Sequence, residues 1–178
     1  LYGAAGTTSL SGIAEVMTNG PSELTSLAVV FVIVGFAFKI SAVPFHTWAP
    51  DTYDGAPMPV TAFLAVASKA AGFVALMNVV FIAFPTQPEV IQWVFFPLAI
   101  ATMTVGNLIA LRQTNIVRML AYSGIAQAGF MLAPFAVSGM VTDPNEAMRA
   151  VVIYLIIYAA MNLGAFAVVI AVARRTGS

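Results

Sequence analysis

Long runs of apolar residues, separated by short polar segments, make up most of this sequence. A helix needs about 20 mostly apolar residues to cross the hydrocarbon core of a bilayer. Five runs reach that length, and residues 1–13 are expected to be the tail of a preceding span. The predicted spans cover residues 24–48, 60–84, 91–111, 116–137 and 147–173. The pattern therefore predicts an all-α, polytopic transmembrane bundle forming one domain over residues 1–178. Since the chain begins within one apolar stretch and ends just past another, we expect an internal fragment of a longer protein.

The short connections between the spans carry residues that start helices. Thr114 and Asn115 can cap the fourth span. Asp143, Pro144 and Glu146 supply an N-cap acid, a first-turn proline and a capping-box glutamate for the fifth. Short connections make neighbouring helices antiparallel, so the loops alternate between two sides of the bundle.

Basic residues are unevenly divided between these two sides. One side holds Arg149, and the other holds Arg112, Arg118, Arg174 and Arg175. Loops rich in Lys and Arg remain on the cytoplasmic side of a membrane. We therefore expect the second side to be cytoplasmic.

Composition excludes several kinds of chemistry. The chain is 61% hydrophobic and 8% charged, against about 25% charged in soluble domains. It has no cysteine and one histidine, His46, which rules out thiolate metal sites, iron–sulfur clusters and a bis-His haem within this chain. There is no nucleotide-binding glycine motif, and no basic cluster that suits nucleic acid. We expect no cofactor or metal here, so any redox chemistry belongs to partner proteins.

Two lysines, Lys39 and Lys69, fall inside predicted spans. Lys69 is about 13 Å of helix past Val60, near mid-membrane, where a lysine costs about 2.5–3.5 kcal/mol to insert. Burial disfavours the charged form of an amine, so such a lysine can take up and release a proton. The alternative is a structural pairing with a carboxylate on another helix. No Asp or Glu lies inside the predicted spans, so that partner would have to be elsewhere.

Pro44 follows Lys39 by five residues and predicts a break in the first span. A proline inside a helix frees the carbonyl four residues back, here that of Ile40. Broken helices with ion-handling residues recur in transporters, where irregular backbone lines a polar cavity. The alternative is an ordinary proline kink.

His46 lies just past this break and suits a proton relay, because histidine titrates near physiological pH. The alternative is a histidine at the membrane boundary beside Trp48. Other polar residues within the spans either carry protons or serve as interhelical hydrogen-bonding groups. The secondary candidates for a polar path are Ser41, Ser68, Tyr122 and Ser123.

Three stretches together resemble the proton-pumping membrane subunits of respiratory complex I. They are GFAFKISAVPFHTWAPDTYDGAP at 35–57, ASK at 67–69 and GNLIALRQTNIVRMLAYS at 106–123. Within that family, YDGAP followed by ASK is most similar to the subunit N group of NADH-quinone oxidoreductases. That group includes mitochondrial subunit 2 and its chloroplast and cyanobacterial counterparts.

The resemblance implies that the five spans are the seventh to eleventh helices of a longer antiporter-like bundle. It implies that Lys39 and Lys69 carry protons at mid-membrane, with His46 between them. It also implies other complex I membrane subunits as partners, with NADH, flavin, iron–sulfur clusters and quinone bound elsewhere in the complex. Two departures matter: the family's acidic partner of Lys39 and its exit-side charged residue lie on helices outside this chain, and Gln127 stands where many relatives carry histidine.

Three functions follow as hypotheses. The first is a membrane-arm subunit that translocates protons across a bacterial-type plasma membrane, or an organellar inner or thylakoid membrane, driven by quinone reduction. The second is a subunit of a multisubunit cation/proton antiporter, which neighbouring genes would distinguish. The third is a structural membrane-arm subunit whose lysines only bind partner helices.

Overall fold

A computed structural model describes the whole chain except residues 20–22, 87, 139, 141–142 and 177–178. All regular secondary structure among the described residues is helical. The helices are α1 (Tyr2–Ala5), α2 (Leu10–Asn19), α3 (Glu23–Ile40), α4 (Trp48–Gly55), α5 (Met58–Phe63), α6 (Lys69–Asn78), α7 (Pro88–Ala110), α8 (Ile116–Ala136) and α9 (Pro144–Thr176). Two π-helical turns, η1 (Leu64–Ser68) and η2 (Val79–Ala83), continue α5 and α6 as one long rod. The all-α expectation is confirmed.

Four helical stretches of the described chain are long and apolar enough to cross a membrane. A fifth, the apolar part of α3 from Leu24 to Ile40, is shorter. The four longer stretches are Met58–Ala83, Pro88–Ala110, Ile116–Ala136 and Asn145–Thr176. The bundle therefore has about five apolar helical segments, as the hydrophobic pattern predicts. The first of them is shorter than predicted.

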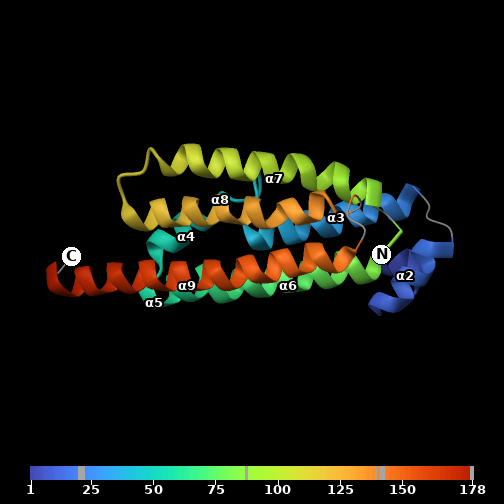
Figure 1. The fold of residues 1–178 in the computed structure, drawn as a ribbon, viewed down its shortest axis with the longest axis horizontal. Helices are drawn as coiled ribbons and strands as arrows, with labels where there is room; N and C mark the ends of the chain where they lie inside the picture. Colours follow the sequence, from blue (N-terminus) through green and yellow to red (C-terminus); the bar gives the residue numbers. More distant parts are fainter. Residues whose placement is uncertain (20–22, 87, 139, 141–142, 177–178) are drawn as a thin grey trace.

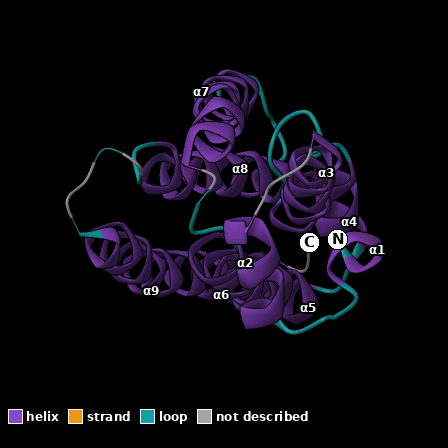
Figure 2. Ribbon diagram, turned by 90° about the vertical axis from the view of Figure 1, so that its right-hand side faces the viewer, coloured by secondary structure: helices purple, strands orange, loops and turns teal. Residues whose placement is uncertain are grey.

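Helix α8 occupies the middle of the bundle, as the end-on view in Figure 2 shows. Half of the most apolar 18-residue stretch of α8 is buried, against 22% of the corresponding stretches of α7 and α9. On one side α7 packs along its length, and on the other lie α6 and α9. Membrane helices gain little from burying apolar surface, so close backbone contact and hydrogen bonds must hold such a bundle together.

Close backbone contact is visible between α7 and α8 at two glycines. A Cβ on Gly106 would lie 2.7 Å from the backbone N of Ala126, and one on Gly129 would lie 2.6 Å from the backbone N of Met103. Neither position has room for a side chain without moving backbone atoms. The two glycines thus allow α7 and α8 to approach closely.

Helix α3 ends at Ile40, although the hydrophobic pattern predicts a span to residue 48. Ser41 adopts a left-handed conformation with φ of 62°. Its N–H donates to the carbonyl of Phe38 at 3.1 Å, and the Ala42 N–H donates to that of Ala37 at 2.8 Å. This pattern is the Schellman motif, which ends a helix and satisfies its last carbonyls.

The predicted break at Pro44 is present, but its proposed cause is wrong in one respect. Pro44 lies in the non-helical connection between α3 and α4, not inside a helix. The helix has already ended at Ser41, so the proline ring displaces no helical carbonyl. The Phe38 carbonyl is not free either, because it also accepts from the Trp48 indole N–H at 3.0 Å.

The first residues form two short helices. Helix α1 ends at Gly6, which has a φ of 65°, so the stretch expected as the tail of a preceding span is interrupted there. Helix α2 packs against η2, and the Thr86 hydroxyl donates to the Met17 carbonyl at 3.1 Å. This contact ties α2 to the far end of the long α5–η2 rod.

Candidate functional site

Lys39 and Lys69 lie on different helices, and the Lys39 amine contacts the residue next to Lys69. Lys39 lies in the last turn of α3, and its Nζ donates to the hydroxyl of Ser68 at 2.8 Å. Its stem lies against α6 at Gly72, where a Cβ would be 3.3 Å from the Lys39 Cγ. Ser68 directly precedes Lys69 in the chain, so the Lys39 amine is bound by the residue next to the second lysine.

Lys69 is buried, with 3% of its surface exposed. Its Nζ donates to the backbone carbonyl of Gly124 on α8 at 2.7 Å. A carbonyl dipole can stabilise an ammonium and can also accept from a neutral amine, so this contact serves both protonation states. The site therefore suits a lysine that changes its charge.

A π-helical turn places Lys69 at the start of α6. The N–H of Lys69 bonds to the carbonyl of Val66 rather than to that of Ala65, four residues back. The Ala65 carbonyl instead accepts the hydroxyl of Tyr158, from α9, at 3.0 Å. Isolated π-helical turns within α-helices are frequent at functional sites. Sequence reasoning treated Tyr158 as one of many polar residues in the spans and gave it no separate role.

Neither lysine pairs with a carboxylate of the described chain. The ion pairs among the described residues are those of Arg118 with Asp51 and Asp54. Lys39 is exposed on the outside of this bundle, apart from its contact with Ser68. The interpretation of the lysines as paired structural groups has no support within these residues.

The break between α3 and α4 holds two buried polar atoms without a partner. They are Ser41 Oγ and His46 Nδ1, which make no hydrogen bond to any described residue. The His46 ring meets Tyr122 of α8 edge-on, with centroids 6.3 Å apart. Nearby, the Val43 N–H donates to the hydroxyl of Thr102 on α7 at 3.0 Å. A buried polar atom is expensive to leave unpaired, and two of the residues singled out from the sequence, Ser41 and His46, each carry one.

The remaining path candidates differ in their surroundings. Ser123 is half-buried on α8 and makes no hydrogen bond to a described residue. Gln127, one turn beyond Gly124, accepts a short hydrogen bond from the hydroxyl of Tyr154. Tyr154 is one turn before Tyr158, so polar groups continue from Lys69 along the α8–α9 contact.

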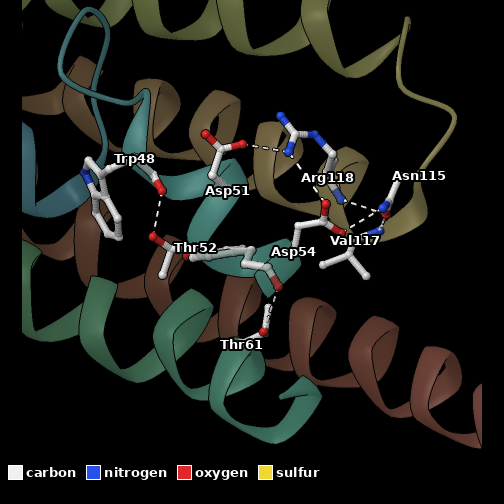
Figure 3. Close-up of polar contacts among 9 residues, drawn as sticks. Trp48, Asp51, Thr52, Asp54, Thr61, Asn115, Val117 and Arg118 are labelled. Carbon is white, nitrogen blue, oxygen red and sulfur yellow. Dashed lines mark hydrogen bonds and ion pairs between the residues drawn. The ribbon is translucent and has the colours of Figure 1, made fainter. Parts of the chain in front are cut away.

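A polar clamp ties α4 to the start of α8 (Figure 3). Arg118 Nη1 lies 2.7 Å from Asp51 Oδ1 and 3.6 Å from Asp54 Oδ2. Asn115 donates to Asp54 at 2.8 Å and caps α8 by accepting from the Val117 N–H at 2.8 Å. The predicted cap at Asn115 is confirmed. The clamp fixes the direction in which the chain leaves the break.

The same clamp bears on the predicted division of charges. Asp51, Asp54 and Arg118 meet at one end of the bundle. In Figure 1 the loop from α7 to α8, helix α4 and the C-terminus all lie at that end. The basic side predicted from the sequence is thus a single end of the molecule.

No group of three or more His, Cys, Asp or Glu side chains that could hold a metal occurs among the described residues. The polar groups of the site are two amines, hydroxyls, one imidazole and backbone carbonyls, and its amines, hydroxyls and imidazole can exchange protons.

Comparisons with known proteins agree with the resemblance. The family described as "NADH:quinone oxidoreductase/Mrp antiporter, TM" matches residues 1–178. NAD(P)H-quinone oxidoreductase subunit 2 of Microcystis aeruginosa (strain NIES-843 / IAM M-2473) is 49% identical over all of this chain and 34% of its own length. The protein of the same name from Prochlorococcus marinus (strain AS9601) is 48% identical over the same shares. The chain thus spans about a third of the length of these relatives.

Two solved structures share the fold. A chain of respiratory complex I from Thermus thermophilus with bound aureothin has a TM-score of 0.74 and 36% identity. The match covers 94% of this chain and 34% of that one. A chain of the Mrp complex from Dietzia sp. DQ12-45-1b has a TM-score of 0.79 at 24% identity, over 94% and 30% of the two chains. The second likeness concerns the fold alone.

Proposed function

Because this chain belongs to the NADH:quinone oxidoreductase/Mrp antiporter family of transmembrane proteins, we propose that it is part of a membrane-arm subunit of an NAD(P)H-quinone oxidoreductase. On this proposal the subunit translocates protons across the membrane. The observation that carries the proposal is the placement of the two lysines: the Lys39 amine bonds Ser68, the residue before Lys69, and the Lys69 amine is buried on the Gly124 carbonyl.

Lys39 and Lys69 act as successive proton carriers. A protonated Lys39 donates to the Ser68 oxygen, and that hydroxyl can pass a proton towards Lys69. Two ammonium groups close together in a site of low dielectric constant repel each other. A proton arriving at one lysine therefore favours release of the proton held by the other. Protons then move in one direction along the path when quinone reduction drives one end of it.

His46 and Ser41 serve the end of the path at the break between α3 and α4. Their unpartnered atoms, Nδ1 and Oγ, can accept water or a proton there. Tyr122, Ser123 and Gln127 lie on α8, which lines the same route. The exposed amine of Lys39 is covered in the complete subunit, where the family resemblance implies an acidic partner.

Quinone reduction elsewhere in the complex supplies the driving force. NADH, flavin, iron–sulfur clusters and quinone belong to partner subunits, and this chain contributes proton carriers and contacts to other membrane subunits. The cyanobacterial relatives indicate a thylakoid or plasma membrane. The end that bears Arg112, Arg118, Arg174 and Arg175 faces the cytoplasm or its equivalent.

The test replaces Lys39 and Lys69 by Ala, singly and together, in the complete subunit within its complex. Proton uptake into vesicles is measured per quinone reduced, alongside assembly of the complex. We expect each variant to assemble and to lose coupled proton translocation. Arg149→Ala is the control, because it removes an exposed positive charge at the start of α9. Normal translocation in the double variant would refute the proposal.

The antiporter hypothesis is tested in the same vesicles, because the matched family includes antiporters. A cation/proton antiporter subunit would release protons on addition of Na⁺ or K⁺ without any quinone. The structural hypothesis predicts that the lysine variants lose assembly rather than translocation.

A further inference from the structure

Tyr158 reaches from α9 into the site without being one of its proton carriers. Its side chain is 2% exposed, and its hydroxyl donates to the Ala65 carbonyl inside the turn η1. That carbonyl is the one that the Lys69 N–H would use in a regular α-helix. The Tyr158 phenol thus donates to a carbonyl that the Lys69 N–H does not use.

The oxygen of Tyr158 and the Lys69 amine both lie beside Gly124. A Cβ on Gly124 would be 3.0 Å from Tyr158 Oη and 3.5 Å from Lys69 Nζ. The hydroxyl proton is engaged with Ala65, so the oxygen lone pairs remain free to accept. Gly124 supplies the carbonyl that Lys69 binds, and its missing side chain leaves room for both the phenol and the amine.

We propose that Tyr158 is a positioning residue for Lys69. Its hydroxyl holds the π-helical turn that aims the amine at Gly124, and its oxygen serves as a second acceptor for the ammonium form. This inference deepens the proposed function and rests on it. It predicts that loss of the hydroxyl favours the neutral amine, so Lys69 holds its proton only at lower pH.

The titratable groups near this site come from three elements. The Lys39 amine of α3 bonds Ser68, next to Lys69, while Tyr53 of α4 and Tyr154 of α9 lie near Tyr158. No carboxylate of the described chain pairs with Lys69. A shift in the pH profile on removing one hydroxyl therefore reports on the amine and its acceptors.

The experiment uses Tyr158→Phe in the complete subunit, assembled in its complex. Proton translocation per quinone reduced is measured across a pH series. We expect the midpoint of the alkaline limb to move about one pH unit to more acidic values, the size expected for one hydrogen bond to a charged group. Tyr2→Phe is the matched control, because it removes an exposed phenol oxygen on α1, outside the site, and its profile should not move.

Gly124→Ala is a second test of the inference, and it leaves the Tyr158 phenol in place. The new Cβ displaces the Tyr158 hydroxyl, so the profile should shift in the same direction. In the Tyr158→Phe background the added methyl meets no hydroxyl, so the double variant should be no worse than Tyr158→Phe alone. Additive losses, or profiles that do not shift in Tyr158→Phe and Gly124→Ala, would overturn the inference. If Lys69→Ala still translocates protons, the proposed function itself fails. If Lys69→Ala loses translocation but the pH profiles of Tyr158→Phe and Gly124→Ala do not shift, only the role of Tyr158 is overturned.

Discussion

The Nζ of Lys39 lies 2.8 Å from the hydroxyl oxygen of Ser68, although 29 residues separate them in the sequence. Ser68 is also the last residue of the turn η1, directly before Lys69. The Ser68 side chain therefore links the end of α3 to the residue directly before Lys69. Its smallness matters, because α3 and α6 approach closely at the neighbouring Gly72.

Ser68→Ala should reduce proton translocation about tenfold, equivalent to about 1.4 kcal/mol in the barrier, while the complex still assembles. The change removes the hydroxyl that the Lys39 amine bonds and alters little volume. Ser68→Thr keeps a hydroxyl and should retain most of the activity. Vesicle proton uptake per quinone reduced distinguishes the two. Equal activity in Ser68→Ala and the parent protein would mean that the hydroxyl carries no protons.

Thr102→Val should destabilise the protein by about 1–3 kcal/mol, because the buried N–H of Val43 loses its acceptor. Valine has nearly the same shape as threonine, so packing is conserved. Thr102→Ser is the control, since it keeps the oxygen that accepts from Val43 and donates to the Leu98 carbonyl. Thermal unfolding of the complete subunit in detergent measures the difference. Matching melting temperatures for the valine and serine variants would contradict the role assigned to this hydrogen bond.

These contacts show which parts of the site the sequence can reveal. Lys39 and Lys69 stand out because an ammonium in an apolar run is costly, whatever the tertiary structure. The contacts of Tyr158 with Ala65 and of Thr102 with Val43 cannot be predicted this way, since their acceptor or donor is backbone and leaves no mark in the residue pattern.

The end of α3 was mispredicted for a related reason. Helix-ending residues in the left-handed conformation are usually glycine. Here the position is Ser41, so the sequence offered Pro44 as the only visible signal and placed the break too late. The central place of α8 is also a tertiary property, because its hydropathy is the lowest of the four long spans.

Gly129→Ala should destabilise the α7–α8 contact by about 1–3 kcal/mol, the usual effect of overpacking. The new methyl would lie 2.6 Å from the backbone N of Met103 and 3.1 Å from the Ala99 carbonyl, neither of which can move without shifting α7. Gly164→Ala is the matched control, because a Cβ there meets nothing within 4 Å. Melting temperatures of the two variants test this, and a loss of stability at Gly164 equal to that at Gly129 would argue against the close contact.

The start of α9 should loosen as the pH falls below the ordinary carboxyl range. Hydrogen bonds from the backbone and side chain of Asn145 hold the pKa of Asp143 below its usual value of 3.8. A carboxyl with a depressed folded-state pKa stabilises the protein above its unfolded pKa and loses that effect as pH falls through the folded value. The protection factor of the Asn145 amide, which compares its exchange rate with the intrinsic rate at the same pH, should therefore fall in acid. Asp143→Asn keeps a capping oxygen but cannot titrate, so its protection factor should lack this acid dependence.

Ser41→Gly should make the protein more stable by about 1 kcal/mol and at the same time less active. Glycine relieves the left-handed backbone at φ of 62°, and it removes a buried hydroxyl that has no partner among the described residues. Ser41→Ala separates the two effects, because it removes the hydroxyl and keeps the backbone strain. If the hydroxyl belongs to the proton path, both variants lose translocation while only Ser41→Gly gains the full stability. Full translocation in Ser41→Ala would instead show that Ser41 is a strained helix end with no part in moving protons.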